Sequence, residues 1–257
     1  MKKIDSFMIL GVKINVLTIN TLANEINRWI KDDFRSYIVL TGVHGIIEMQ
    51  KNQELREINN NAGLVTPDGM PTVWYGKLLG YKSIEKVYAP DIMFKIFSQS
   101  TEFEYKHYLY GGKDGVAEKL SEILQKKYPG IEIVGTFCPP FRELTDNEIS
   151  DISEDINKSG ANIVWCGLGC PKQEKWMYKF RNKLNAQVLI GVGAGFDFLS
   201  GEKPLASEFV KNSGFEWLYR LIKDPKYLWK RYFKIVPLFI IYNFLYFLGL
   251  YKRKNHK

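Results

Sequence analysis

The sequence predicts an α/β fold in which helices cover a mostly parallel sheet. Short apolar runs typical of buried strands alternate with segments whose apolar residues recur at helical spacing. Several runs end in glycine-rich turns, which are typical of the edge where such sheets bind ligands. A chain of 257 residues suffices for one large domain, or for one domain with an appendage.

Each expected element follows from its local pattern. Alternating or continuous apolar runs predict strands at 6–17, 37–41, 64–67, 108–110, 131–135, 163–166 and 188–190. Apolar residues spaced three and four apart predict helices at 21–29, around 46–49, from 71, at 91–97, 116–128, 147–157 and from 172. Because strands and helices alternate, the connections are expected to be right-handed crossovers of a parallel sheet.

The stretch 64–74 holds the most informative local pattern. An apolar run ends at Pro67, the carboxylate Asp68 follows, and Gly69 and Pro71 lead into a helical pattern. This order predicts a strand, a tight turn and a helix, with Asp68 at the carboxyl end of the strand. From the spacing alone, an acidic turn residue before a helix is the simpler explanation, so the case for function depends on the rest of the chain.

Positive charge is concentrated in the C-terminal fifth of the chain. Residues 211–257 hold eleven Lys and Arg and two acidic residues, a balance of +9, whereas residues 1–210 hold 25 basic and 26 acidic residues. This asymmetry predicts a core at 1–212 and a basic, aromatic appendage at 213–257. The appendage is expected to meet an anionic partner such as nucleic acid, phospholipid or a phosphate-bearing substrate.

Cysteine and histidine usage argues against a metal site and a disulfide framework. Three cysteines, Cys138, Cys166 and Cys170, are an odd and sparse set for this length, and no Cys/His spacing resembles a zinc site. Asp5 and Lys13 interrupt the apolar run that a signal peptide would need. We therefore expect reduced thiols, no cofactor, and a protein body inside the cell.

A dinucleotide-dependent dehydrogenase is one alternative that the glycine-rich turns suggest. Its fingerprint opens the first helix, and an acidic residue closes the next strand. Here Lys172 stands where the third glycine after Gly167 and Gly169 belongs, and the strand after Gly111 ends without an acid. A nucleic-acid binder is the other alternative, because aromatic residues accompany the basic tail, but they are spaced as for helix packing.

Five runs match a known family in the family's own order. They are Pro67-Asp68-Gly69-Met70-Pro71-x-x-Trp74, Gly111-Gly112-Lys113, Gly167-Leu168-Gly169-x-Pro171-Lys172-Gln173-Glu174-Lys175-Trp176, Gly191-x-Gly193-Ala194-x-Phe196-Asp197-Phe198 and Gly214-Phe215-Glu216-Trp217-Leu218-Tyr219-Arg220-Leu221. Through these runs the chain resembles the bacterial WecB/TagA/CpsF glycosyltransferases over nearly its whole length.

The resemblance implies an inverting transferase with a Rossmann-like core. Such enzymes move a sugar, best known as N-acetylmannosamine, from a UDP donor to a polyprenyl-diphosphate-linked acceptor during teichoic acid or related polysaccharide synthesis. Two departures leave UDP-glucose, UDP-glucuronate or another UDP-hexose open as the donor. Lys86 replaces a common arginine, and the run 138–142 is more similar to capsule and exopolysaccharide members.

The resemblance also implies roles for single residues. It makes Asp68 the catalytic base, and it places Thr41, Lys86, Gln173, Asp197, Arg220 and Arg231 at the substrates. For Asp197, a helix-cap or turn role is the alternative. Because the sequence contains no Asp-x-Asp pair to hold a metal, cationic side chains are expected to stabilise the departing diphosphate.

The end of the appendage is expected to contact a membrane. Asp224 and Pro225 can start a helix, and residues 235–250 are uncharged, with basic residues on both sides. Because a spanning helix needs about 20 apolar residues, we expect peripheral attachment at the cytoplasmic face, with a short span as second choice and a buried core helix as the alternative. The sequence leaves open whether the protein forms oligomers.

Overall fold

A six-stranded parallel sheet organises the protein. The computed structural model describes residues 4–207, 210, 214 and 216–251, except the side chains of Tyr227 and Arg231. The strand order is β4-β3-β8-β7-β5-β6. The strands are β3 (Ser36–Thr41), β4 (Leu64–Pro67), β5 (Lys106–Gly111), β6 (Glu132–Phe137), β7 (Ile163–Gly167) and β8 (Val188–Gly191). All strands run parallel, so their carboxyl ends meet at one edge.

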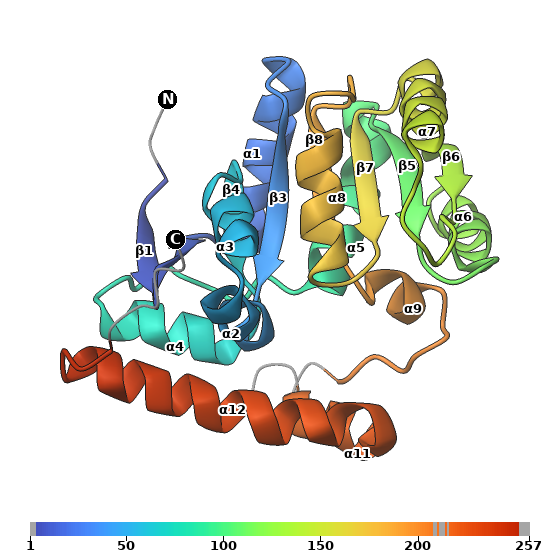
Figure 1. Cartoon of the computed structure of the whole chain (residues 1–257). Coiled ribbons are helices and arrows are strands. Elements are labelled where there is room, and N and C mark those ends of the chain that lie inside the picture. The colour runs from blue at the N-terminus through green and yellow to red at the C-terminus, as the bar shows by residue number, and fades with distance from the viewer. Residues whose placement is uncertain (1–3, 208–209, 211–213, 215, 252–257) are drawn as a thin grey trace.

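Helices cover both faces of the sheet (Figure 1). One face carries α2 (Val43–Lys51), α3 (Gln53–Asn60), α7 (Asp146–Ser159) and α8 (Lys172–Phe180). The other carries α1 (Ile19–Lys31), α5 (Ala89–Phe103), α6 (Val116–Lys127) and α9 (Gly195–Leu199). Each face has its own apolar core, and successive strand residues alternate between the two cores. The strands therefore read as continuous apolar runs, as in parallel sheets buried on both sides.

The N-terminal strands form a separate hairpin. The prediction of strand structure at 6–17 is confirmed as β1 (Ser6–Ile9) and β2 (Val12–Asn15), which pair antiparallel in a two-stranded sheet. The side chain of Asn15 accepts a hydrogen bond of 2.8 Å from the backbone of Val65. This bond ties the hairpin to β4 and so to the element that precedes Asp68.

The C-terminal helices lie along the carboxyl edge of the sheet. In Figure 1, α12 (Pro225–Phe247) runs below α2 and α4 (Met70–Leu78), and α11 (Glu216–Lys223) lies at its N-terminal end. Ile235 is buried, and the hydroxyl of Tyr251 donates to Gln50 on α2 at 3.0 Å. The appendage thus packs on the core, and the predicted boundary at residue 212 stays a prediction.

The predicted helix beginning at Pro225 is confirmed, but it is longer than the sequence suggested. It continues through Pro237 to Phe247, so the basic stretch and the apolar run belong to one helix. Asp224 holds the N-cap position without making a capping hydrogen bond. Over the residues that the structure describes, no helix is long and apolar enough to cross a membrane.

A buried histidine in β5 makes stability depend on pH. The indole of Trp165 donates to Nδ1 of His107 at 3.1 Å, and Nε2 lies 2.7 Å from the hydroxyl of Ser100. The Ser100 hydroxyl donates to the carbonyl of Ile96, so we take Nε2 as the protonated nitrogen. Burial lowers the pKa of His107 from 6.5 to about 3.

We therefore expect acid to destabilise the wild-type protein more steeply than a His107→Gln variant. The unfolded state binds a proton at this residue between about pH 6.5 and pH 3, whereas the folded state does not. The stabilisation is complete above pH 6.5 and is lost toward pH 3, by up to about 1.4 kcal/mol per pH unit. Urea unfolding across this pH range measures it. Equal pH slopes for both proteins would contradict the assignment.

Candidate active site

Asp68 is fixed where β4 leaves the sheet. Its backbone N–H donates to the carbonyl of Thr41, at the end of β3, over 3.1 Å. Gly42 packs so closely that an added Cβ would lie 2.6 Å from the carbonyl oxygen of Asp68. Gly69 has φ of +100°, a conformation that glycine adopts without a steric cost. The prediction of a strand, tight turn and helix around Asp68 is confirmed, and the turn holds this residue at the carboxyl edge.

The segment before α5 runs beside this turn. The backbone N–H of Val87 donates to the carbonyl of Pro67 at 3.0 Å, so the flanking residues Lys86 and Tyr88 lie next to β4. Tyr88 is buried, and the side chain of Lys86 is only 9% exposed. The ammonium group of Lys86 lies 5.2 Å from the centre of the Tyr88 ring. The segment beside the turn of Asp68 therefore carries a cation and an aromatic ring that lie close to each other.

The appendage contributes a second cation. The guanidinium of Arg220 lies 5.2 Å from the ring centre of Tyr88 and 5.1 Å from that of Phe198. Glu216, one turn earlier in α11, accepts from Arg220 over 2.6 Å and from Lys86 over 3.1 Å. Lys86 and Arg220, predicted separately as substrate-binding residues, are therefore brought together by one carboxylate.

Electrostatic interactions join Arg220 to Asp68. Burial by itself lowers the pKa of the Arg220 guanidinium. Attraction to the oxygen of Tyr88 and to the carboxylates of Glu216 and Asp68 outweighs that effect and raises the pKa, so the charge is permanent. Burial also raises the pKa of Tyr88, whose hydroxyl therefore stays protonated. The site pairs a carboxylate with a permanent cation at the ligand-binding edge.

Thr41 lies at this edge, but its hydroxyl is occupied. The residue is 1% exposed, and its hydroxyl donates to the side chain of Asn59 at 2.7 Å. Through its backbone carbonyl, Thr41 instead holds the turn that carries Asp68. Direct contact of Thr41 with a substrate stays a prediction.

Gln173 connects two glycine-rich loops. It is buried in the first turn of α8, and its carbonyl oxygen accepts from the backbone of Gly169 at 3.1 Å and of Gly193 at 2.9 Å. Its amide nitrogen donates to Glu174 at 3.1 Å, and burial raises the pKa of that carboxyl. Gln173 thus shapes the loops after β7 and β8, while contact with a nucleotide stays a prediction.

The two remaining predicted site residues are Asp197 and Arg231. The carboxylate of Asp197 pairs with Lys203 at 2.7 Å, and its backbone carbonyl accepts from the same residue. This turn-forming arrangement agrees with the structural alternative for Asp197, although its neighbour Phe198 flanks Arg220. The backbone of Arg231 belongs to α12, and its side chain lies outside the described residues.

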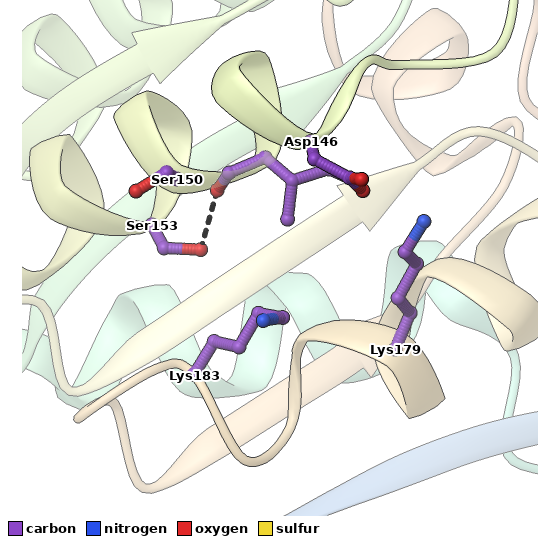
Figure 2. A pocket seen from close by; sticks show the side chains of 6 residues that line it. Asp146, Ser150, Ser153, Lys179 and Lys183 are labelled. Carbon is purple, nitrogen blue, oxygen red and sulfur yellow. Dashed lines mark hydrogen bonds between the residues drawn. The ribbon is translucent and has the colours of Figure 1, made fainter.

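The contacts described above join Lys86, Tyr88, Phe198, Glu216 and Arg220 into a cluster that is mainly cationic and aromatic. Within the described part of the chain, no group of three or more His, Cys, Asp or Glu side chains is placed to hold a metal ion. Two open hollows, of about 360 and 330 Å³, lie away from the cluster. Figure 2 shows the first, between α7 and the end of α8, where Lys179 and Lys183 lie opposite Ser150 and Ser153. None of the predicted site residues lines either hollow.

Three residues of the cluster were not predicted as site residues from the sequence. Tyr88 and Phe198 wall the guanidinium of Arg220, and Glu216 bridges the two cations. The spacing of four between Glu216 and Arg220 was a usable signal, because such residues are neighbours on a helix. Lys86 is 130 residues from Glu216 in the sequence, so residue spacing could not predict the contact between them.

Comparison with known proteins relates this chain to one family. Residues 7–253 match the model of the glycosyl transferase WecG/TagA/CpsF family. Three relatives carry the name N-acetylglucosaminyldiphosphoundecaprenol N-acetyl-beta-D-mannosaminyltransferase. The protein of Bacillus spizizenii is 26% identical over 78% of this chain and 76% of its own, and that of Bacillus subtilis is 26% identical over 72% and 70%. The Staphylococcus aureus MRSA252 protein is 24% identical over 97% and 94%.

The family match covers nearly the whole chain, including the turn of Asp68 and the helix of Arg220. It agrees with the family that the five sequence motifs indicated. This chain belongs to the WecG/TagA/CpsF family of glycosyltransferases.

Proposed function

We propose that this protein is an inverting, metal-independent hexosyltransferase. It moves a hexose from a UDP-sugar to a sugar carried on a polyprenyl diphosphate, in the synthesis of teichoic acid or another cell-surface polysaccharide. N-acetylmannosamine is our first choice of hexose, because the three relatives are named for its transfer. UDP-glucose, UDP-glucuronate and other UDP-hexoses of capsule or exopolysaccharide synthesis are the alternative donors.

One observation carries the proposal: the segment that packs beside the turn of Asp68 brings Lys86 and Tyr88 to Arg220 at the carboxyl edge of the sheet, where ligands of such folds bind. Glycosyl transfer with inversion needs a base on the acceptor side and positive charge on the leaving-group side. A carboxylate from the core and a guanidinium from the appendage supply both. Lys86 adds a second positive charge beside Arg220.

The proposed reaction is a single displacement. The acceptor hydroxyl oxygen attacks the anomeric carbon of the donor and forms the new glycosidic bond, while the bond from that carbon to the UDP oxygen breaks. Asp68 takes the hydroxyl proton. UDP leaves with the bonding electron pair, and Lys86 and Arg220 stabilise the charge that develops on its diphosphate. Arg231 is expected to add to this charge.

The choice of donor sugar rests on residues that differ from the N-acetylmannosaminyl pattern. Lys86 stands where an arginine is common, and it offers a point charge in place of a bidentate fork. The loop after β6 contains Phe141, which is 96% exposed, with Lys172 3.8 Å from its ring centre. Both features are compatible with a hexose other than N-acetylmannosamine, which is why several donors must be tested.

The lipid-linked acceptor implies work at the cytoplasmic face of the membrane. α12 presents an exposed apolar stripe beside the exposed cations Lys226, Lys230 and Lys234. The members of the stripe are Trp229, Phe233, Ile240, Phe244 and Phe247. An apolar stripe flanked by lysines fits peripheral binding to anionic lipid. We therefore propose peripheral attachment through α12.

The proposal is tested with a panel of donors. Purified protein is incubated with an undecaprenyl-diphosphate-linked N-acetylglucosamine acceptor and with UDP-N-acetylmannosamine, UDP-N-acetylglucosamine, UDP-glucose or UDP-glucuronate. Lipid-linked disaccharide and free UDP are measured together. We expect one donor to give equal amounts of both products, with inversion at the anomeric carbon. Failure of all four donors with this acceptor, or a retained configuration, would count against the proposed reaction.

Transfer should survive chelation. The sequence has no Asp-x-Asp pair, and Lys86 and Arg220 both pair with Glu216, so two neighbouring cations are available to balance the diphosphate. We expect EDTA-treated protein to keep its initial rate within about twofold. An activity abolished by EDTA and restored by Mg²⁺ or Mn²⁺ would show that a metal carries the leaving group.

A further inference from the structure

Glu216 makes two ion pairs at the junction of core and appendage. Its Oε1 accepts from Arg220 over 2.6 Å, and its Oε2 accepts from Lys86 over 3.1 Å. The exposed fractions of these side chains are 14% for Glu216, 9% for Lys86 and 33% for Arg220. Each carboxylate oxygen therefore holds a different cation in a partly desolvated place, where charge-assisted hydrogen bonds are strong.

Two cations this close repel each other unless an anion lies between them. Glu216 lies between them and supplies that anion. The guanidinium of Arg220 also lies against the neighbouring rings of Tyr88 and Phe198, which limit its movement. Glu216 and the two rings thus hold the cations in place, and cations held in place lower the entropy that binding must offset.

The bridge also links two parts of the chain. Lys86 belongs to the core segment that β4 holds through Val87, whereas Glu216 begins α11 of the appendage. Removing the charge of Glu216 would remove this ion pair between core and appendage and the ion pair of Arg220 within α11. The same carboxylate therefore contributes to the contact of the appendage with the core and to the placement of both cations.

We infer that Glu216 is a positioning residue that sets Lys86 and Arg220 side by side to receive one diphosphate group. The inference rests on the proposed function for the identity of the ligand, a nucleoside diphosphate. Glu216 itself touches neither the reacting carbon nor the acceptor hydroxyl in this account. Its effect on binding and transfer passes through the two cations.

The test is Glu216→Gln, which keeps the size of the side chain and removes its charge. Isothermal titration with UDP should give a Kd about tenfold higher than that of the wild type, because charge-assisted bonds to both cations are lost. The matched control is Glu154→Gln in α7. It removes an exposed ion pair to Lys158 that is also 2.6 Å long and four residues apart, and it should leave the Kd unchanged.

A double-mutant cycle separates positioning from general damage. Lys86→Met should raise the Kd for UDP about tenfold in the wild type but less than about threefold in the Glu216→Gln background, where the pair is already disorganised. Additive effects would overturn the inference. Glu216→Asp keeps the charge but is too short to reach both cations, and it should fall between wild type and Glu216→Gln.

Whether Glu216→Gln raises or lowers the Kd for UDP distinguishes two roles of Glu216. If Glu216→Gln binds UDP more tightly, the carboxylate competes with the ligand and the inference is wrong. Inorganic pyrophosphate is titrated in parallel. Binding of pyrophosphate without UDP binding or sugar transfer would reject the proposed function, while its weakening in Glu216→Gln would still support positioning. A wild type that binds neither anion would overturn both.

Discussion

Replacing Asp68 by Asn should lower the turnover number about 100-fold or more while leaving the fold and UDP binding intact. The substitution keeps the backbone bond from residue 68 to Thr41 and the turn through Gly69, so the edge of the sheet should be preserved. It removes the proposed base, and general-base assistance is typically worth about 10²–10⁴-fold in rate. Arg220 keeps its partner Glu216, so the cation pair should still bind UDP.

The measurement is steady-state transfer with the preferred donor, together with titration of UDP. Asp114→Asn is the control, because Asp114 is an exposed acid in the turn after β5, at the same edge of the sheet. The control should keep its turnover number within about twofold. A turnover number near that of the wild type in Asp68→Asn would remove Asp68 from the catalytic role.

Placing two glutamates on the outer stripe of α12 should release the protein from membranes. Phe244 and Phe247 are 61% and 87% exposed, and burying each in a bilayer is worth about 1.5–3 kcal/mol. Each glutamate also adds repulsion of about 1 kcal/mol from an anionic surface. The Phe244→Glu/Phe247→Glu variant should therefore bind phosphatidylglycerol vesicles at least about tenfold more weakly in sedimentation assays.

The same variant distinguishes an effect on membrane attachment from an effect on sugar transfer itself. Transfer to an undecaprenyl acceptor in vesicles should fall, and transfer to a short-chain, water-soluble acceptor should persist. Truncation at residue 235 is less informative, because Ile235 and Phe239 cover the core next to α2. Phe141→Glu, on the loop after β6, is the control for adding charge at an exposed phenylalanine. Undiminished sedimentation of the double variant would place the attachment elsewhere.

The local pattern of apolar and polar residues was sufficient to predict most of the fold. The apolar runs of the parallel strands are continuous because both faces are buried, and this composition distinguishes them from half-exposed strands. Among the helices that the structure describes, the sequence did not predict α3, which is polar over most of its eight residues, or α9, which has only five residues and is too short to show periodicity. Nothing in the sequence around residues 6–17 indicated that the hairpin would stand apart from the main sheet.

The sequence by itself determined the α/β class, the turn that carries Asp68, the helix that starts at Pro225 and the family. These depend on neighbouring residues or on motifs read in order along the chain. The tertiary structure alone decided which residues meet. Lys86 and Glu216 are 130 residues apart, and Arg220 contacts Tyr88, at the start of α5, and Phe198, in α9. Contacts over such separations depend on how the sheet and helices pack, which residue spacing cannot encode.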